Sequence, residues 1–290
     1  MLINTVILLL RDALPLILFF ALLLLNAGKC IHLSSDSRTS LKGFYYHIFN
    51  RAPNIIFWGV ALSFSVLTTS LLVGNLADIS QKFGGKGNEI LFSITLLIIY
   101  LLIVFILYLL HHKINITNNS RKTTISVIVV FILVFTLNAT NFFTYILGFW
   151  SQPKLQFGLV IGIILGAGIC ISVSILFYFS LLLIRTKYQQ SIIKILFLLF
   201  GCGQLIQALN LLLQVDLLPS YSALWDSSFI INEDGELGHF FTALVGYEAT
   251  PSLLHLCVYC CALILPLVAY LYYFNDSEAR YDLGAKNEES

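Results

Sequence analysis

The most unusual residues of this sequence are two adjacent charges, Arg11 and Asp12, inside an otherwise apolar segment at about 2–25. A charged side chain at the centre of a membrane helix costs about 2.5–3.5 kcal/mol, so a retained pair marks either a transport pathway or a buried ion pair. Adjacent helix positions point about 100° apart, so we expect the two side chains to satisfy each other only in part. Pro15 lacks the N–H that would bond the carbonyl of Arg11, which either frees an oxygen ligand or only kinks the helix.

Carboxamide side chains recur at helical spacing in two other apolar segments. Asn138, Asn141 and Tyr145 are spaced i, i+3 and i+7 and therefore share one helix face. A second set repeats this spacing and consists of Gln207, Asn210 and Gln214. Such side chains either line a hydrated path or bond helix to helix, at about 0.6–2 kcal/mol each. On the first interpretation, six residues form a translocation pathway. They are Arg11, Asp12, Asn138, Asn141, Gln207 and Asn210.

The segment at about 215–250 carries six acidic residues and no Lys or Arg. Uncompensated carboxylates on an outer face would raise the local concentration of cations, although exterior loops generally lack basic residues anyway. We take five of these acids, together with the one acid inside a span, as candidate metal ligands. They are Asp12, Asp226, Glu233, Asp234, Glu236 and Glu248.

The composition of the chain indicates which kind of element positions these residues. The chain has 290 residues, of which 58% are hydrophobic and 11% charged, whereas soluble proteins carry about 25% charged residues. A bilayer core about 30 Å thick requires about 20 apolar residues per helix. Seven segments qualify, at about 2–25, 55–76, 90–110, 124–149, 157–184, 192–214 and 251–274. We therefore expect an all-α polytopic membrane bundle of seven transmembrane helices.

Gly158, Gly162 and Gly166 form a double GxxxG pattern, which predicts a close helix crossing.

The distribution of basic residues orients these helices. Of the 16 Lys and Arg residues, twelve lie in the first, third and fifth connections and the tail, and three lie in the alternate connections. Because Lys and Arg are retained in the cytoplasm, we predict an N-terminus outside, a C-terminus inside and a cytoplasmic polar tail at 276–290. The net charge of +1 predicts no nucleic-acid partner, and the lipid bilayer is the expected environment.

Several runs in the C-terminal third carry a family resemblance. They are Leu218-Pro219, Leu224-Trp225-Asp226-Ser227-Ser228 and Gly246-Tyr247, followed by Pro251-Ser252-Leu253. In these runs the chain resembles the high-affinity, oxidase-dependent iron permeases (EfeU/Ftr type). The resemblance implies one transmembrane domain over 1–275, built from two inverted three-helix repeats plus a C-terminal helix. It also implies iron as the transported ion without a permanently bound cofactor, an oxidase or periplasmic partner that supplies iron, and a plasma membrane location, as in a bacterial inner membrane.

The family signature is Arg-Glu-x-x-Glu, once in the first and once in the fourth span. Here the first copy corresponds to Arg11 and Asp12, with Pro15 in place of the second acid, and the second copy aligns with Asn138 and Asn141. The four acids and two arginines of the family site would carry a net charge of −2, whereas Arg11 and Asp12 sum to zero. The sequence leaves open whether another acid, Glu89 or Asp78, turns inward.

We therefore expect an iron-permease-like membrane transporter, not an enzyme, with an altered central site and no catalytic residue. One alternative is a non-conducting accessory or regulatory subunit of the same fold. Another is a membrane redox protein that uses Cys257 and Cys260, whose C-x-x-C spacing is otherwise explained by plain packing.

Overall fold

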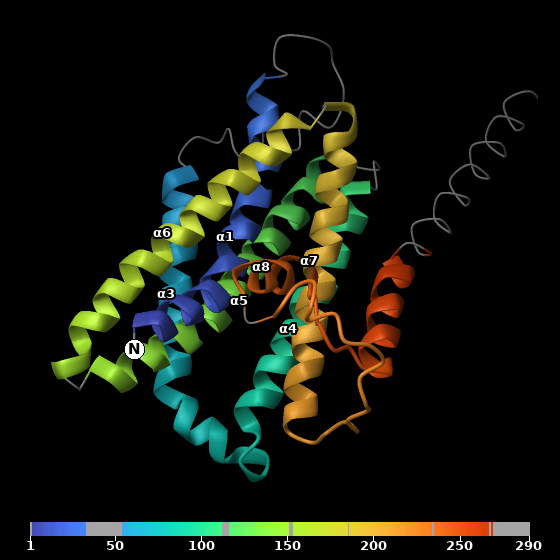
Figure 1. Cartoon of the computed structure of the whole chain (residues 1–290). Coiled ribbons are helices and arrows are strands. Elements are labelled where there is room, and N and C mark those ends of the chain that lie inside the picture. Colours follow the sequence, from blue (N-terminus) through green and yellow to red (C-terminus); the bar gives the residue numbers. More distant parts are fainter. Residues whose placement is uncertain are drawn as a thin grey trace, which may run out of the picture.

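The computed structural model describes residues 2–32, 54–111, 116–150, 153–184, 186–233, 235–266 and 268, which form a helix bundle (Figure 1). Six helices in this part are long and apolar enough to cross a membrane. They are α1 (Leu2–His32), α3 (Asn54–Gln81), α4 (Gly87–His111), α5 (Ile116–Trp150), α6 (Pro153–Leu183) and α7 (Thr186–Gln214). The expected all-helical, multi-pass membrane bundle is thereby confirmed. The predicted seventh span is described only over the shorter apolar helix Leu253–Pro266, and the tail at 276–290 lies outside the described residues.

The long helices pack mainly in pairs, with α1 against α6, α4 against α7, and α3 against α5. The contact between α1 and α6 depends on two of the predicted glycines. A Cβ atom on Gly162 would lie 2.7 Å from the Cβ of Thr5, and one on Gly166 would lie 3.2 Å from the Cβ of Leu9. Small residues at this spacing let two helices approach closely, so the predicted crossing is confirmed.

The connection between α3 and α4 marks one end of the bundle. It contains the short 3-10 helix η1 (Lys82–Gly84), followed by Gly85 in the left-handed conformation at φ +90°. Next to it, the ammonium group of Lys86 donates a hydrogen bond to the carbonyl of Val215, just beyond the last residue of α7. We refer to this end, where α4 begins and α7 finishes, as the η1 end. It is the lower end of the bundle in Figure 1.

The dry core lies in the half of the bundle away from the η1 end. Aromatic rings hold its centre, since Phe19 of α1 stacks on Phe200 of α7 at 5.4 Å and meets Phe197 edge-on at 5.8 Å. Aliphatic side chains of α4 and α5 surround these rings. They include Ile99, Ile103, Ile106, Val130 and Val134, all of them buried. These residues come from the second half of α4 and the first half of α5, so the four helices meet in apolar contact there.

The segment after α7 differs from the exterior loop that we expected. Its residues Glu236–Val245 form the helix α8, and Leu244 packs against Leu14 in the interior of α1. Gly246, at φ +72°, ends α8 so close to α7 that an added Cβ would lie 2.6 Å from the Cα of Gly203. Figure 1 shows α8 in the centre of the molecule between α1 and α7. This part of the segment therefore folds back into the bundle.

Candidate functional site

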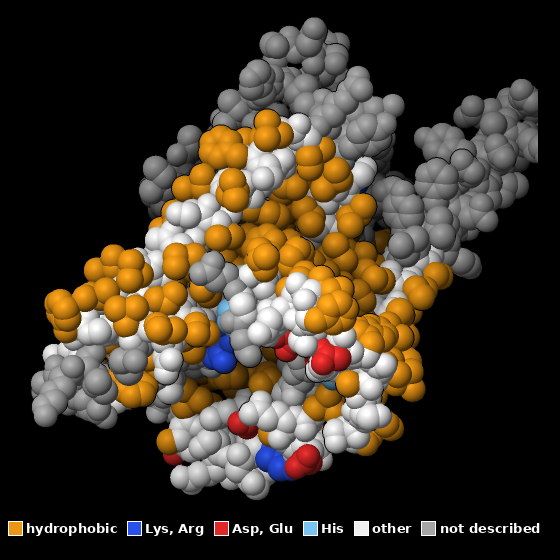
Figure 2. Space-filling view, viewed as in Figure 1, with side chains coloured by type: hydrophobic (Ala, Val, Ile, Leu, Met, Phe, Trp, Pro, Cys, Tyr) orange, Lys and Arg blue, Asp and Glu red, His pale blue; other side chains and the backbone are white. Residues whose placement is uncertain are grey.

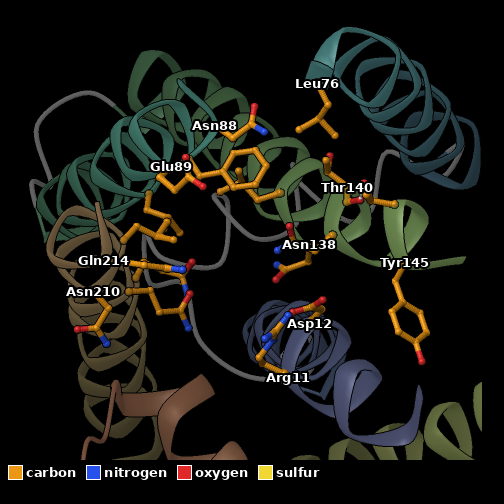
Figure 3. Close-up of a pocket in the computed structure, with 18 of the residues that line it drawn as sticks. Arg11, Asp12, Leu76, Asn88, Glu89, Asn138, Thr140, Tyr145, Asn210 and Gln214 are labelled. Carbon is orange, nitrogen blue, oxygen red and sulfur yellow. Dashed lines mark hydrogen bonds and ion pairs between the residues drawn. The ribbon is translucent and has the colours of Figure 1, made fainter. Parts of the chain in front are cut away.

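A polar cavity of about 830 Å³ lies in the half of the bundle nearest η1, between α1, α4, α5 and α7 (Figure 3). In the space-filling view, charged side chains gather around a hollow in a surface that is otherwise largely apolar (Figure 2). All six residues predicted for the translocation pathway line this cavity. They are Arg11, Asp12, Asn138, Asn141, Gln207 and Asn210. The structure thus brings these residues together, and their part in transport stays a prediction.

Helix α1 contributes the charged pair. Nε of Arg11 donates to Oδ1 of Asp12 at 3.0 Å, so the two neighbours do form an ion pair. The side chain of Arg11 is 59% exposed, whereas that of Asp12 is 6% exposed. Oδ2 of Asp12 is buried and has no hydrogen-bond partner. The expectation that the pair satisfies itself only in part is therefore confirmed, and one carboxylate oxygen is left for a ligand.

Helix α5 presents the face predicted from its spacing. Asn138, Asn141 and Tyr145 all line the cavity, together with Thr140 and Thr144 between them. The amide of Asn138 donates to the carbonyl of Val134 at 2.8 Å, and the two threonine hydroxyls donate to carbonyls of their own helix. Because these donors are used within α5, the oxygens of Asn138 and of the threonines are left to face the cavity.

Helix α4 supplies a second carboxylate. Asn88 and Glu89, in its first turn, line the cavity, and Oδ1 of Asn88 and Oε2 of Glu89 are buried without a hydrogen-bond partner. Figure 3 shows both residues on the side of the cavity opposite Asp12. Asp78, by contrast, is exposed and does not line the cavity. The question that the sequence left open is thus answered for both residues, since Glu89 turns inward and Asp78 does not.

Helix α7 adds a row of four carboxamides that the spacing also anticipated, and all of them line the cavity. They are Gln204, Gln207, Asn210 and Gln214. Gln204 lies deepest, at only 2% exposure, and its Nε2 has no hydrogen-bond partner. A polar group buried without a hydrogen-bond partner costs about 1–3 kcal/mol, so the amide of Gln204 is a destabilising feature of the cavity wall.

The electrostatics of the cavity follow from three charged residues. Arg11, Asp12 and Glu89 are the lining residues that carry formal charge, and they sum to −1. The remaining polar lining is neutral, mainly carboxamide and hydroxyl oxygen. Hard cations prefer such oxygen ligands, but an unaccompanied trivalent ion would keep an uncompensated charge of +2 here, which is costly away from water.

Of the predicted metal ligands outside the membrane spans, the structure describes the side chains of Asp226, Glu233 and Glu248, and these three do not form one site. Asp226 is exposed, and its hydrogen bonds with the side chain and with the backbone N–H of Ser228 lower the pKa of its carboxyl group. Glu233 accepts from the backbone N–H of Ala249. Asp234 and the side chain of Glu236 lie outside the described residues. Within the described part of the chain, no three His, Cys, Asp or Glu side chains are grouped so as to hold a metal ion.

One residue near the cavity, His255, was not expected to take part in a site. His255, in the first turn of the helix Leu253–Pro266, is bonded through Nε2 to Oδ1 of Asn210 at 2.6 Å and lies 3.0 Å from Oε2 of Glu248. The cysteines of the C-x-x-C pattern lie farther along the same helix, and Cys257 and Cys260 are both exposed and free.

Comparison with protein-family models, with curated protein sequences and with solved structures gives no match for this chain.

Proposed function

We propose that this protein is an integral membrane transporter of the iron-permease type, and that the cavity between α1, α4, α5 and α7 is its translocation pathway. The observation that carries the proposal is the convergence of six polar residues from three apolar helices on one cavity. Polar side chains in membrane spans are expensive and generally line a substrate path or bond to one another. Three buried atoms of such side chains have no hydrogen-bond partner: Oδ2 of Asp12, Oε2 of Glu89 and Nε2 of Gln204. Their lack of partners favours a substrate path over bonds between helices.

The pairing of the helices supports the two inverted repeats that the resemblance implies. If α1, α3 and α4 correspond to α5, α6 and α7, the contact of α1 with α6 becomes the contact of α5 with α3. The contacts of α4 with α7 and of α1 with α5 map onto themselves. Because each repeat has three spans, the two copies would have opposite orientations, as in other transporters with a central site.

The cavity lies toward one end of the described bundle. Its lining runs from the start of α4 and the end of α7 down to Gln204, and the buried aromatic cluster around Phe19 fills the bundle beyond. The distribution of Lys and Arg predicts that the η1 end faces outside. We therefore take this conformation as outward-facing, in a plasma membrane such as a bacterial inner membrane.

We propose iron as the cargo, delivered by an oxidase or a periplasmic partner. The lining charge of −1 does not compensate a bare ferric ion, so iron would enter with water, hydroxide or another small anion still bound. A cavity of about 830 Å³ has room for such a complex. Asp12 and Glu89 are the proposed charged ligands, and the carboxamides are the neutral ones.

The test is uptake of radioactive iron by cells that lack their own permease and express the full chain. Asp12→Asn and Glu89→Gln should each lower uptake about tenfold or more, since the loss of only about 1.4 kcal/mol of ion binding has this effect. Asp78→Asn is the matched control, because Asp78 is an exposed acid of α3 outside the cavity, and it should leave uptake unchanged. Uptake that survives Asp12→Asn would overturn the role of Asp12.

One observation favours a second candidate, a non-conducting accessory or regulatory subunit. The guanidinium of Arg11 already neutralises Asp12, so the cavity offers less negative charge than a ferric pathway would need. This alternative predicts no metal flux in the wild type and stable complexes with other membrane proteins, which a pull-down from membranes would detect.

A further inference from the structure

The lining of the cavity contains both acceptors and a donor that lack partners. Among the described residues, three buried acceptors of the lining have no hydrogen bond: Oδ2 of Asp12, Oδ1 of Asn88 and Oε2 of Glu89. Nε2 of Gln204 is a buried donor that also has none, in a side chain that is 2% exposed. A bare metal ion binds acceptors only, because an N–H group presents its hydrogen to the ligand. The lining therefore fits a ligand that has a positive centre and, beside it, oxygen atoms that accept hydrogen bonds.

Arg11 adds a charged donor to this lining. Its contact with Asp12 is a single one, from Nε to Oδ1 at 3.0 Å, and its side chain is 59% exposed. Because this contact uses Nε, the two terminal nitrogens of the guanidinium are left for another ligand. Their planar, forked arrangement matches the oxygen atoms of a carboxylate or another oxyanion. Figure 3 shows Arg11 beside Asp12, across the cavity from Glu89. Arg11 is therefore placed to bind an anion next to a cation that the two carboxylates hold.

The charge of the lining fits a dianion. Arg11, Asp12 and Glu89 sum to −1, so a ferric ion, at +3, would give the cavity a total charge of +2. A monoanion bound to the metal ion would leave +1, whereas a dianion brings the total to zero. An uncompensated charge away from water is costly, so the combination with a dianion is the most favourable of these.

We propose that the cargo is a ferric ion bound to one small dianion with accepting oxygen atoms, such as a dicarboxylate or a tetrahedral oxyanion. Arg11 and Gln204 bind the anion. Asp12 and Glu89 bind the metal ion. This inference rests on the transport function proposed above and names the class of its substrate. Because each component supplies the charge that the other lacks, the metal ion and the dianion strengthen each other's binding to the cavity. Arg11 thus contacts the cargo, in addition to its ion pair with Asp12.

The experiment measures ion binding to the purified full-length protein in an uncharged detergent, so its outcome does not depend on transport. Terbium(III), a hard trivalent ion that stays dissolved in mildly acidic buffer, replaces the ferric ion and is followed by its luminescence. At least one of two dianions, malonate or sulfate, should tighten terbium binding about tenfold or more. Malonate represents the dicarboxylates and sulfate the tetrahedral oxyanions, so the two arms distinguish the kinds of anion. Acetate, a monoanion, should have a smaller effect. Chelation in solution alone would weaken terbium binding, because it lowers the concentration of the free ion.

Three variants assign this effect to residues. Arg11→Gln removes a positive charge, so terbium alone should bind at least as tightly as to the wild type, but the dianions should no longer tighten its binding. A variant that had lost its fold would bind neither. Gln204→Leu removes the buried donor and should reduce the tightening severalfold. Lys82→Gln is the matched control, because Lys82 is an exposed cation at the η1 end outside the cavity lining, and it should leave the tightening unchanged.

The inference is overturned if neither dianion tightens terbium binding, if acetate acts as strongly as the dianions, or if the tightening survives Arg11→Gln. A complete absence of terbium binding would overturn it as well. Terbium binding that does not respond to the dianions would still leave the cavity as a cation pathway. Joint binding without uptake of radioactive iron by cells would instead contradict transport and retain the site for the metal ion and its anion.

Discussion

The two halves of the helix bundle use the same four central helices for opposite purposes. Away from the η1 end, α1, α4, α5 and α7 meet through buried aromatic and aliphatic side chains around Phe19 and Phe200. Toward the η1 end, the same helices separate around a cavity lined with carboxamides and three charges. The change occurs within one turn of α5, where the buried Val134 is followed by Leu137 and Asn138 at the cavity wall.

This difference shows how a chain that is 58% hydrophobic can hold a polar site at membrane depth. The apolar contacts away from the η1 end fix the positions of the helices. The half nearest η1 can therefore keep polar atoms unpaired without the helices closing around them. Unpaired groups of this kind lower stability, and they are retained where they serve binding. The comparison therefore predicts that the same substitution costs more stability in the half away from the η1 end than at the cavity.

The largest expected effect comes from placing a carboxamide in the dry half. Val134→Asn should lower the free energy of unfolding by about 3 kcal/mol or more, because Val134 is fully buried in the apolar cluster. Leu137, three residues later on the same helix, is also buried but lines the cavity, so Leu137→Asn places the same group beside polar side chains and should cost less. Denaturant unfolding of the purified variants measures both. Equal losses would show that the two halves do not differ in access to water.

A somewhat smaller effect is expected where α1 is fixed against α6. Gly162→Leu would push into Thr5 and should cost about 2–3 kcal/mol, since overpacked contacts are relieved only by backbone movement. Gly168→Leu is the control on the same helix, because an added Cβ there meets nothing within 4 Å. Because α1 carries Arg11 and Asp12, Gly162→Leu should also disturb the cavity. Thermal unfolding in detergent would compare the two variants, and a similar loss for Gly168→Leu would contradict the assignment.

The third effect is a gain of stability. Gln204→Leu replaces a buried amide whose Nε2 has no partner. The free energy of unfolding of this variant should therefore be higher than that of the wild type by about 1 kcal/mol. If the cavity binds its cargo through this amide, iron uptake should fall in the same variant. A loss of stability would indicate that Gln204 is already satisfied in the protein and belongs to the scaffold.

The polar faces of α5 and α7 were predictable because helical spacing alone decides which side chains share a face. The sequence could not predict that these faces line one cavity, since this depends on how four helices pack. Glu89 illustrates this, because it begins a span and only the tilt of α4 decides whether it turns inward. α8 was missed for another reason: Glu236–Val245 is too short for a membrane span and follows an acidic, turn-rich segment.

The cluster around Glu248 was the least predictable part of the site. Asn210 and His255 are 45 residues apart in the sequence, and no periodicity connects residues on two different helices. The acids of the segment at 215–250 suggested metal capture when they were considered together. Their individual surroundings distinguish them, since Asp226 is stabilised as a carboxylate by a hydrogen bond whereas Glu248 is not.

The smallest expected effect tests this distinction through the pH dependence of stability. Because the pKa of Glu248 is raised on folding, the folded protein binds this proton more tightly than the unfolded chain does. Stability must therefore fall as pH rises from the unfolded pKa through the folded one. Glu248→Gln removes this loss, so the variant should match the wild type at acidic pH and unfold at a slightly higher temperature at alkaline pH. Asp226→Asn should show the opposite sign, because a lowered pKa stabilises the folded state above the unfolded value and neutralising this carboxyl removes that contribution. A common response of both variants would contradict the difference between the environments of the two acids.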